Sequence, residues 1–433
     1  MREDLLQFIW KFKYFNLNEL TSFNGEPIEI IHPGTHNFDQ GPDFLNARIK
    51  ISGTLWIGNV ELHVFSRQWV LHKHQLDRNY SNVILHVVWK HDGEVENLNG
   101  NVLPTLELEG RVAGTLLEKY QSLMEREQKG ELHFIPCENH LAKMKIEDIK
   151  LSAWKNRLVA ERLEARTARV FEILEQTKFH WDETMWRMVA ANFGVNINGQ
   201  FSYRIAESVS QKILARHKNQ LITIEAMLFG QASLLNESFT DPYPKLLQRE
   251  YRFYNNKYNF PRVDGSALFG RMRPANFPTI RLAQLASLVF KSSHLFSRIK
   301  DFESVKDVKN ALQVEPNDFW LYHYKLNEPD GDQEPKKKTL GNQMIENIII
   351  NSVCTILFAY GIYNNDDTIK EKSIDWLEAL KPEKNKITRG FESLGILNNN
   401  AFDSQGLIHL KKAYCDKKRC LECAIGNLIL GTS

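Results

Sequence analysis

Residues 41–65, GPDFLNARIKISGTLWIGNVELHVF, decide the fold of the first part of this chain. Residues 47–51 and 60–64 each alternate apolar with other side chains, a period of two that is typical of β-strands. Ser52-Gly53 separates the two segments at the distance expected of a hairpin. We therefore predict two antiparallel strands joined by a tight turn.

The segments on either side of this hairpin complete an α/β layer. They predict a helix at residues 5–15, a strand at 27–31, a short helix or helical loop at 66–80, a strand at 82–89 and an edge strand at 102–108. The strand at 82–89 is almost unbroken in apolar residues, as in strands buried on both faces. The predicted order is helix, three antiparallel strands, helix and strand.

From about residue 114 the apolar pattern becomes helical and largely stays so. The chain of 433 residues is too long for one compact core. We predict an α/β domain at residues 1–112, a connecting segment at 113–140, and a mostly α-helical domain at 141–433 that carries a C-terminal group of cysteines.

Composition describes a folded protein in a reducing compartment. Apolar residues make up 42% of the chain and charged residues 25%, and there are only five cysteines. The N-terminus carries acids at positions 3 and 4 and no small-residue cleavage site, so we expect no secretory signal. The apolar stretch at 348–363 contains polar residues and is shorter than the ~20 residues that span a bilayer. These features predict a cytoplasmic protein that does not enter membranes.

Charge and motifs narrow the classes of function. Residues 1–110 carry 9 Lys and Arg against 14 Asp and Glu, whereas residues 141–220 carry 14 against 9. Any surface for phosphates is therefore expected on the helical part. The chain has no Walker loop, dinucleotide fingerprint, HExxH or GxSxG. Nucleotide hydrolysis, dehydrogenase, zinc protease and serine esterase chemistry consequently lack support.

Two acids and a histidine fall together on the predicted hairpin. Glu61 and His63 point to one side of their strand because successive strand side chains alternate. Asp43 lies at the mouth of the preceding strand, about as far from the turn as Glu61. Carboxylates and an imidazole at one sheet end can hold a divalent cation that activates water against a phosphodiester. The alternative is that Asp43 is a turn residue and that Glu61 and His63 face solvent.

This arrangement resembles the core of the PD-(D/E)XK nuclease superfamily, whose core has an aspartate on one strand and Glu-x-Lys on the next. Pro42-Asp43 and Glu61-Leu62-His63 occupy matching positions, eighteen residues apart. The resemblance implies a restriction-endonuclease-like fold, Asp43 and Glu61 as Mg²⁺ or Mn²⁺ ligands, and Glu3 as an accessory acid. His63 replaces the family's lysine, which implies that it orients water, ligates the metal or acts as a base, or that activity is lost.

Over its whole length the chain also resembles an uncharacterised family of bacterial proteins that is defined only as a domain of unknown function. The matching stretches are GPDFLNARI, GNVELHV, NVILHVVWKHD, RMRPANFPTIRLAQLA and the terminal YC with CLECAIG. This second resemblance implies no activity.

Further histidines follow the Glu-x-His strand. His72, His74 and Asp77 could join His63 in a second metal-binding group with nitrogen and oxygen ligands. They could equally cap a short helix over the sheet. His86 alternates with apolar neighbours in a central strand, which predicts a core histidine.

The C-terminal cysteines form a second candidate metal site. Cys415, Cys420 and Cys423 have the spacing C-x4-C-x2-C, and Zn²⁺ or an iron–sulfur cluster usually takes four ligands. Cys137 is the expected fourth ligand, with His409 as the alternative. Some nucleases of the superfamily named above hold an iron–sulfur cluster on one distant and three clustered C-terminal cysteines. The other reading is three reduced thiols near the C-terminus.

Arg271, Arg273 and Arg281 surround a turn stiffened by prolines. Arginines on a rigid turn suit bidentate contacts with phosphate or another anion. They could instead pair with Glu225 or Asp241 inside the helical domain.

Together these patterns predict a metal-dependent nuclease-like protein that acts on or binds nucleic acid phosphodiesters. Asp43 and Glu61 would hold Mg²⁺ or Mn²⁺, and His63 would orient water. The alternative is a catalytically inactive scaffold or interaction protein that keeps the fold.

Overall fold

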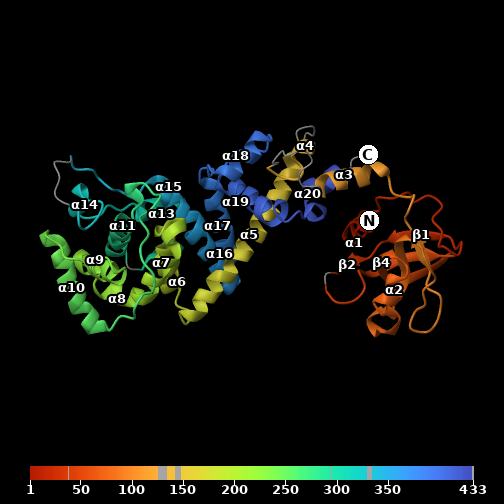
Figure 1. Cartoon of the computed structure of the whole chain (residues 1–433), viewed down its shortest axis with the longest axis horizontal. Helices are drawn as coiled ribbons and strands as arrows, with labels where there is room; N and C mark the ends of the chain where they lie inside the picture. The colour runs from red at the N-terminus through yellow and green to blue at the C-terminus, as the bar shows by residue number, and fades with distance from the viewer. Residues whose placement is uncertain (38, 125–133, 142–147, 293, 329–333, 432–433) are drawn as a thin grey trace. The chain divides into compact units, whose positions relative to one another are not determined.

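The computed structural model divides the chain into two compact units. The sheet unit comprises Met1–Leu151 and Leu410–Ser433, and the helical unit comprises Ser152–His409. The structure describes every residue except 38, 125–133, 142–147, 293, 329–333 and 432–433 (Figure 1). Residues 125–133 of the predicted connecting segment therefore lie outside the described residues. The predicted boundaries differ from this division, because the last residues group with the N-terminal part.

The sheet unit holds all the strands that the structure describes. They are β1 (Ile28–His32), β2 (Thr35–His36), β3 (Phe44–Ile51), β4 (Thr54–Phe65), β5 (Val83–Lys90) and β6 (Thr105–Glu107). The helices of this unit are α1 (Glu3–Phe12), α2 (Gln68–Leu71), α3 (Gly114–Met124), α4 (Glu138–Leu141) and α20 (Ala424–Gly431). Short 3-10 turns η1 (His74–Leu76), η2 (Arg78–Tyr80) and η6 (Cys420–Glu422) and the π-turn η5 (Leu410–Cys415) connect them.

The sheet is mixed, in the order β1-β3-β4-β5-β6, with β2 also paired to β3. β1, β3 and β4 are antiparallel, and the hairpin predicted at Ser52-Gly53 is confirmed, with both turn residues at positive φ. β5 then runs parallel to β4, and β6 runs parallel to β5 at the edge. A parallel pair requires a crossover connection, and the segment with α2, η1 and η2 supplies it.

Gly58 allows β4 to approach β5 closely. A Cβ at this position would lie 2.7 Å from the carbonyl oxygen of Asn82 and 2.4 Å from the side chain of Ile84. A side chain here would therefore push the two strands apart at the end of the sheet where Glu61 lies.

Both faces of β4 are covered, which the sequence pattern did not predict. α1 packs on β4 with Leu6, Ile9 and Trp10 fully buried, and α2, whose Trp69 is fully buried, contacts the same strand. Consequently Glu61 (5% exposed) and His63 (1% exposed) are buried like the leucine between them. The reading that these two side chains face solvent is wrong.

Among its described residues, the helical unit contains helices and connecting loops but no strand. They are α5 (Asp148–Gln176), which begins just before the unit, α6 (Trp181–Phe193), α7 (Val195–Ser208), α8 (Gln211–Arg216), α9 (Leu221–Gln231), α10 (Pro242–Tyr258), α11 (Pro278–Lys291), α12 (Leu295–Asp301), α13 (Val305–Leu312), α14 (Phe319–Tyr322), α15 (Asn342–Ile348), α16 (Cys354–Asn364), α17 (Asp367–Ala379), α18 (Lys386–Ser393) and α19 (Ala401–His409). The 3-10 turn η3 (Pro274–Asn276) precedes α11, and the π-turn η4 (Ile349–Val353) links α15 to α16.

One continuous helical segment in this unit, Asn342–Asn364, is long and apolar enough to cross a membrane by length and composition. Its 23 residues correct the prediction that the apolar stretch falls short of a span. However, 72% of its apolar window is buried inside the protein. The segment is therefore packed like the core helix of a soluble protein.

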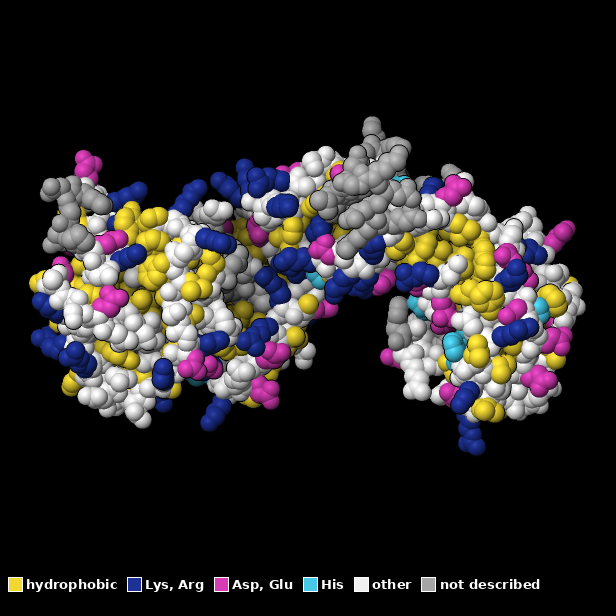
Figure 2. Space-filling view, in the orientation of Figure 1, with side chains coloured by type: hydrophobic (Ala, Val, Ile, Leu, Met, Phe, Trp, Pro, Cys, Tyr) yellow, Lys and Arg dark blue, Asp and Glu magenta, His cyan; other side chains and the backbone are white. Residues whose placement is uncertain are grey.

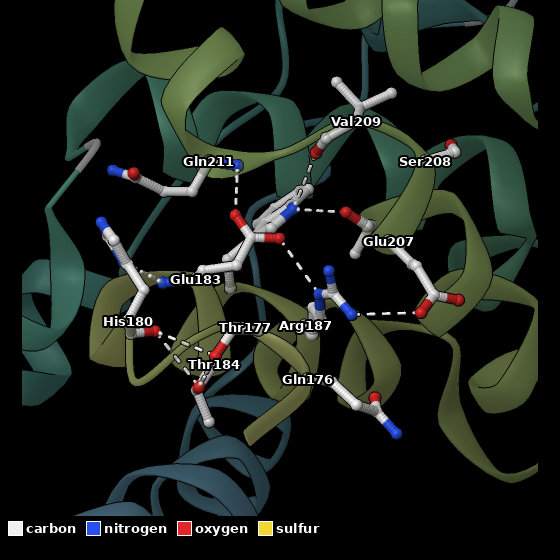
Figure 3. Close-up of polar contacts among 12 residues, drawn as sticks. Gln176, Thr177, His180, Glu183, Thr184, Arg187, Glu207, Ser208, Val209 and Gln211 are labelled. Carbon is white, nitrogen blue, oxygen red and sulfur yellow. Dashed lines mark hydrogen bonds and ion pairs between the residues drawn. The ribbon is translucent and has the colours of Figure 1, made fainter. Parts of the chain in front are cut away.

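A polar network joins α6 to α7 and α8 (Figure 3). Glu183 accepts hydrogen bonds from Arg187 Nε at 3.0 Å and from the backbone N–H of Gln211 at 2.7 Å. Arg187 also pairs with Glu207 at 3.1 Å. Glu183 and the Arg187 guanidinium are largely shielded from water, so each buried charge here has a partner of opposite sign.

Glu225 on α9 is the contrasting case, since it is fully buried and no Lys or Arg in the described part of the chain forms an ion pair with it. Its carboxylate accepts hydrogen bonds from Asn317 Nδ2 at 2.6 Å, from Trp320 Nε1 at 3.2 Å and from the hydroxyl of Tyr243. Burial raises the pKa of Glu225 to about 7, and the three donors oppose that rise. The side chain does not pair with the arginines around residue 273. Asp241 does not either, because it caps α10 through the backbone N–H of Tyr243.

We predict that Glu225→Gln makes the helical unit less sensitive to pH. Because the folded pKa is raised, the folded state binds more protons than the unfolded chain between about pH 4.5 and 7. Stability is therefore fully present in acid and is lost as the pH rises through 7. Urea unfolding should show the wild type losing on the order of 3 kcal/mol more than Glu225→Gln between about pH 5 and pH 8.

The exposed Glu371→Gln is the matched control and should follow the wild type. Equal pH dependence in all three proteins would contradict this account of Glu225.

Candidate functional site

Asp43 and Glu61 lie side by side at one end of the β3–β4 pair. The backbone N–H of Asp43 donates to Glu61 Oε2 at 3.0 Å, and the backbone N–H of Leu62 donates to Asp43 Oδ2 at 3.0 Å. Gln7, from α1, donates from Nε2 to Asp43 Oδ1 at 2.7 Å. These bonds fix both carboxylates and leave Glu61 Oε1 facing the rest of the site.

Three histidines meet beside Glu61. His63 lies two residues further along β4, His72 follows α2, and His74 opens η1. Their ligand nitrogens all lie within 4.8 Å of one another. In Figure 2 histidine side chains reach the surface of the sheet unit in the region of α2. The structure thus merges the two predicted clusters into one site.

The separations between donor atoms are those of ligands around one ion. His63 Nε2 lies 3.2 Å from His72 Nδ1 and 3.6 Å from Glu61 Oε1, and His74 Nε2 lies 3.3 Å from the same oxygen. Two ligands about 2.1 Å from a single metal ion are separated by roughly 3.0–3.4 Å at octahedral to tetrahedral angles. Glu61 Oε1, His63 Nε2 and His74 Nε2 can therefore contact one cation, whereas His72, which groups with the two histidines but not with Glu61, would have to rotate toward it.

His74 Nε2 is a buried nitrogen without a hydrogen-bond partner, although it lies close to Glu61 Oε1. The contact is short enough for an ion pair but not aligned as a hydrogen bond. Buried polar atoms are nearly always satisfied, so an orphaned ligand atom aimed at a carboxylate suggests a missing partner. A metal ion between the two would satisfy both.

His86, on β5, holds His63 from behind. Its Nε2 lies 2.9 Å from His63 Nδ1, on the side of the ring opposite His72. Histidines that ligate metals usually have their other ring nitrogen bonded in this way, which fixes the ring orientation. The register of β4 with β5 pairs Glu61 with His86, and the crossover brings this histidine to the site.

Burial keeps the imidazoles of the site neutral and makes its carboxyl groups harder to ionise. Burial, with the neighbouring histidines, lowers the pKa of His63 to about 2, and burial lowers the pKa of His86 to about 3. Burial also raises the pKa of Asp43 and of Glu61 well above the usual carboxyl range, and the Glu61 charge adds to the effect on Asp43. A divalent cation would relieve the repulsion that these carboxylates feel when ionised.

Some predicted residues take other roles, and some contributors were not predicted. Asp77 accepts a hydrogen bond from the backbone N–H of Asn79 and so caps η2 outside the donor set. Glu3 lies close enough for its charge to interact with His72 and His74, and burial raises its pKa. Gln7 and His86 were missed as site residues. The spacing of Gln7 from Glu3 by one helical turn is the signal that could have found it.

Four of the five cysteines share the sheet unit. Cys415 ends η5, Cys420 begins η6, Cys423 immediately precedes α20, and Cys137 immediately precedes α4. All are free thiols. Burial and then its cysteine neighbours Cys423 and Cys420 raise the pKa of Cys137 to about 12.

Burial first, and then Cys423, Cys137 and Cys420, likewise raises the pKa of Cys415. The four thiols are therefore close enough to influence one another. His409 belongs to the helical unit, where its Nε2 lies 3.4 Å from Glu161 Oε2. Cys354 is fully buried in α16.

The three arginines predicted to act together do not all line the same pocket. Arg273 and Arg281 line a pocket in the helical unit, whereas Arg271 is not among the residues that line it. Arg281 donates to the amide oxygens of Gln284 and Asn276 rather than to a carboxylate.

Comparison with known proteins identifies the family of this chain but no function. The family model described as "Protein of unknown function (DUF2851)" matches residues 3–386. The sequence-based assignment to a domain-of-unknown-function family is thereby confirmed. The matched range includes the histidine and carboxylate site and Cys137 but ends before the three C-terminal cysteines. No curated protein and no solved structure matches the chain.

We predict that the metal-free protein loses stability as the pH rises, through Asp43 and Glu61. Their raised pKa values mean that the folded state keeps protons which the unfolded chain has released. The contribution is fully present below about pH 4 and declines as the pH rises through the raised values. In EDTA, the melting temperature of the wild type should fall relative to that of Asp43→Asn between about pH 5 and pH 8.

Asp39→Asn, at an exposed position, is the matched control. Parallel melting curves for wild type and Asp43→Asn across this range would show that the Asp43 carboxyl is not held protonated.

Proposed function

We propose that this chain, which belongs to the DUF2851 family, is a metal-dependent nuclease-like phosphodiesterase. Its metal would be held by Glu61 Oε1 and by the ligand nitrogens of His63, His72 and His74, with Asp43 beside them. The observation that carries the proposal is the convergence of these donors at 3.2–3.6 Å from their nearest neighbours, with His74 Nε2 left unsatisfied.

The architecture supports a PD-(D/E)XK-like fold. α1, the antiparallel strands β1, β3 and β4, the short α2 and then β5 follow the order of the superfamily core. Asp43 precedes the second of these strands, and Glu61 and His63 lie on the third. Where that superfamily carries lysine, this site has a histidine surrounded by further histidines.

The donor set favours a transition metal over Mg²⁺. Imidazole nitrogens suit zinc, iron and related ions, whereas Mg²⁺ prefers oxygen ligands. Mn²⁺ accepts both kinds of donor and stays within the initial expectation of Mg²⁺ or Mn²⁺. When bound, such an ion would lower the pKa of a coordinated water and polarise a phosphodiester oxygen.

Other residues of the site would orient the metal ligands and transfer protons. His86 orients His63 through the bond between His63 Nδ1 and His86 Nε2, so His63 presents Nε2 to the site. Asp43, held by Gln7 and the N–H of Leu62, has a carboxyl pKa that burial and then the Glu61 charge raise to about 8. A cation bound beside it would lower that pKa again, and the ionised carboxylate could then take a proton from an attacking water. Glu61 connects the histidines to Asp43, because its Oε2 accepts a hydrogen bond from the backbone N–H of Asp43.

The competing proposal is a scaffold that keeps this fold without cleaving nucleic acid. The excess of acids in residues 1–110 favours it, because this part would repel a phosphate backbone unless a cation is bound. The unsatisfied nitrogen and the donor separations favour metal binding in both cases. Cleavage and metal binding must therefore be measured separately.

We also propose that Cys137, Cys415, Cys420 and Cys423 hold an iron–sulfur cluster or, less favoured, zinc. A single zinc ion with Zn–S bonds of ~2.3 Å would keep its sulfurs about 4 Å apart. Among the described residues, no three cysteine sulfurs lie within 4.8 Å of one another. A cluster places several irons between its thiolates and so suits wider spacing. Metal binding would also deprotonate thiols whose pKa burial has raised.

The first proposal predicts that Glu61→Gln and His74→Ala each abolish stoichiometric Mn²⁺ binding in calorimetric titrations. Both should reduce Mn²⁺-dependent cleavage of a nucleic acid panel at least about 100-fold, because the metal and its activated water are lost. His32→Ala, an exposed histidine of the same sheet, is the control and should leave both readouts unchanged.

Cleavage that survives both variants would exclude this site as the catalytic centre. Metal binding by the wild type without cleavage of single- or double-stranded DNA or RNA would favour the scaffold.

The second proposal predicts iron and acid-labile sulfide in protein purified without air, with visible absorption that bleaches on reduction. Cys420→Ala should lose that iron, whereas Cys354→Ala, which removes a buried thiol of the helical unit, should keep it. Zinc in place of iron would indicate the mononuclear alternative. Absence of both metals after growth in iron-supplemented medium would leave four ordinary thiols.

A further inference from the structure

The helical unit contains a pocket of about 920 Å³ whose charged lining is entirely cationic. It is walled by α5, α6, α7, α11 and α15 together with the segment before α15. The cations that line it are Arg166, Arg169, Arg273, Arg281 and Lys336–Lys338. None of the described lining residues is Asp or Glu.

Arg281 on α11 has only neutral partners. Its guanidinium donates to Gln284 Oε1 at 2.9 Å and to Asn276 Oδ1 at 2.6 Å. Nε is buried without any hydrogen-bond partner. No described carboxylate lies within ion-pair distance of this half-buried cation.

Arg166 and Lys338 repeat this arrangement on other walls of the pocket. Arg166 donates to the amide oxygens of Asn351 and Gln405. Lys338, only 7% exposed, donates from Nζ to the carbonyl oxygen of Leu321 at 2.9 Å and lies 4.3 Å from the centroid of the Tyr324 ring. Neither has a carboxylate partner among the described residues.

Around the pocket, the exposed cations have carboxylate partners and the buried cations do not, which is the reverse of the usual arrangement. The exposed Arg169 and Lys337 do have carboxylate partners, Glu172 at 2.8 Å and Glu315 at 3.4 Å. Exposed pairs contribute little, whereas a buried charge without a counter-charge is strongly destabilising. Burial accordingly lowers the pKa of Arg166, Arg281 and Lys338. The charge of Glu383 acts on Arg166 and that of Glu328 acts on Lys338 without forming an ion pair, whereas Arg281 has no such neighbour, so the described lining itself supplies no carboxylate to any of the three.

We infer that this pocket binds an oligophosphate, either free or as the phosphate chain of a nucleotide or a nucleic acid strand. Two guanidinium groups match phosphate oxygens in bidentate geometry, and a buried ammonium adds a point charge. Several cations call for more than one phosphate group. The volume lies within the range of pockets that enclose a small organic ligand and leaves room for a group beyond the phosphates. This inference does not depend on the metal site of the sheet unit.

The test is calorimetric titration of the full-length protein in EDTA, so that the metal site does not contribute. Three probes distinguish the sources of phosphate: inorganic tripolyphosphate, ATP, and a 5′-phosphorylated tetrathymidylate. We expect at least one to bind, with at least a tenfold weaker affinity in Arg281→Gln. Arg249→Gln, which changes an exposed arginine outside the pocket, should bind like the wild type.

A thermal melt separates ligand binding from a purely structural role of Arg281. Without ligand, Arg281→Gln should melt no lower than the wild type, because it removes an uncompensated charge. The probe that binds should raise the melting temperature of the wild type more than that of the variant. If Arg281→Gln does not fold, Lys338→Met replaces it in both measurements with the same expectations.

The pattern across probes then identifies the ligand. Binding of tripolyphosphate alone would assign a free oligophosphate, and preference for ATP or the oligonucleotide would assign the attached group. Failure of all three to bind below about 1 mM would overturn the inference. Equal affinity of the variant and the wild type for every probe that binds would overturn it as well.

Discussion

The structure of the sheet unit depends on ionisable groups enclosed in its middle layer. Glu61 and His63 occupy a strand covered on both faces, and His86 lies beside them on the neighbouring strand. Neither carboxylate of the Asp43–Glu61 pair has a lysine or arginine within ion-pair distance in the part of the chain that the structure describes. Burying such groups without a cation is costly, and folded proteins relieve that cost by protonation or by metal binding. The raised carboxyl pKa values indicate that protonation relieves the cost in the metal-free protein. The donor separations would let a bound metal ion relieve it instead.

The local geometry of the hairpin was predictable from sequence because it rests on a period of two. Residues 47–51 and 60–64 set the strand faces, and Ser52-Gly53 set the turn, so the proximity of Asp43 to Glu61 followed from counting. The crossover was harder to predict. His72 and His74 lie in a short helix and a 3-10 turn that no periodicity specifies, and their approach to His63 depends on β5 returning parallel to β4. His86 looked like a core residue because its neighbours are apolar, and it is buried as predicted. Its bond to His63 required knowledge of the register between strands.

The helical unit shows a different limit of sequence reasoning. Its helices were predicted from amphipathic patterns, whereas the partners of individual charges were not, because they come from distant segments. Glu225 was one of two candidate partners for the arginines but is bound by Tyr243, Asn317 and Trp320. Arg281 was named among the anion-binding candidates, but Arg166 and Lys338 were not, since they lie more than fifty residues away in either direction. Such sets are determined by tertiary packing alone.

The central claim is that one divalent ion binds between Glu61 and the histidines of the sheet unit. The most direct measurement is an anomalous difference map from crystals of the Mn²⁺-loaded protein, collected at the manganese absorption edge. The account predicts one peak within bonding distance of Glu61 Oε1, His63 Nε2 and His74 Nε2, with His72 rotated toward it. An ordered site without a peak, at Mn²⁺ concentrations that saturate binding in solution, would contradict it.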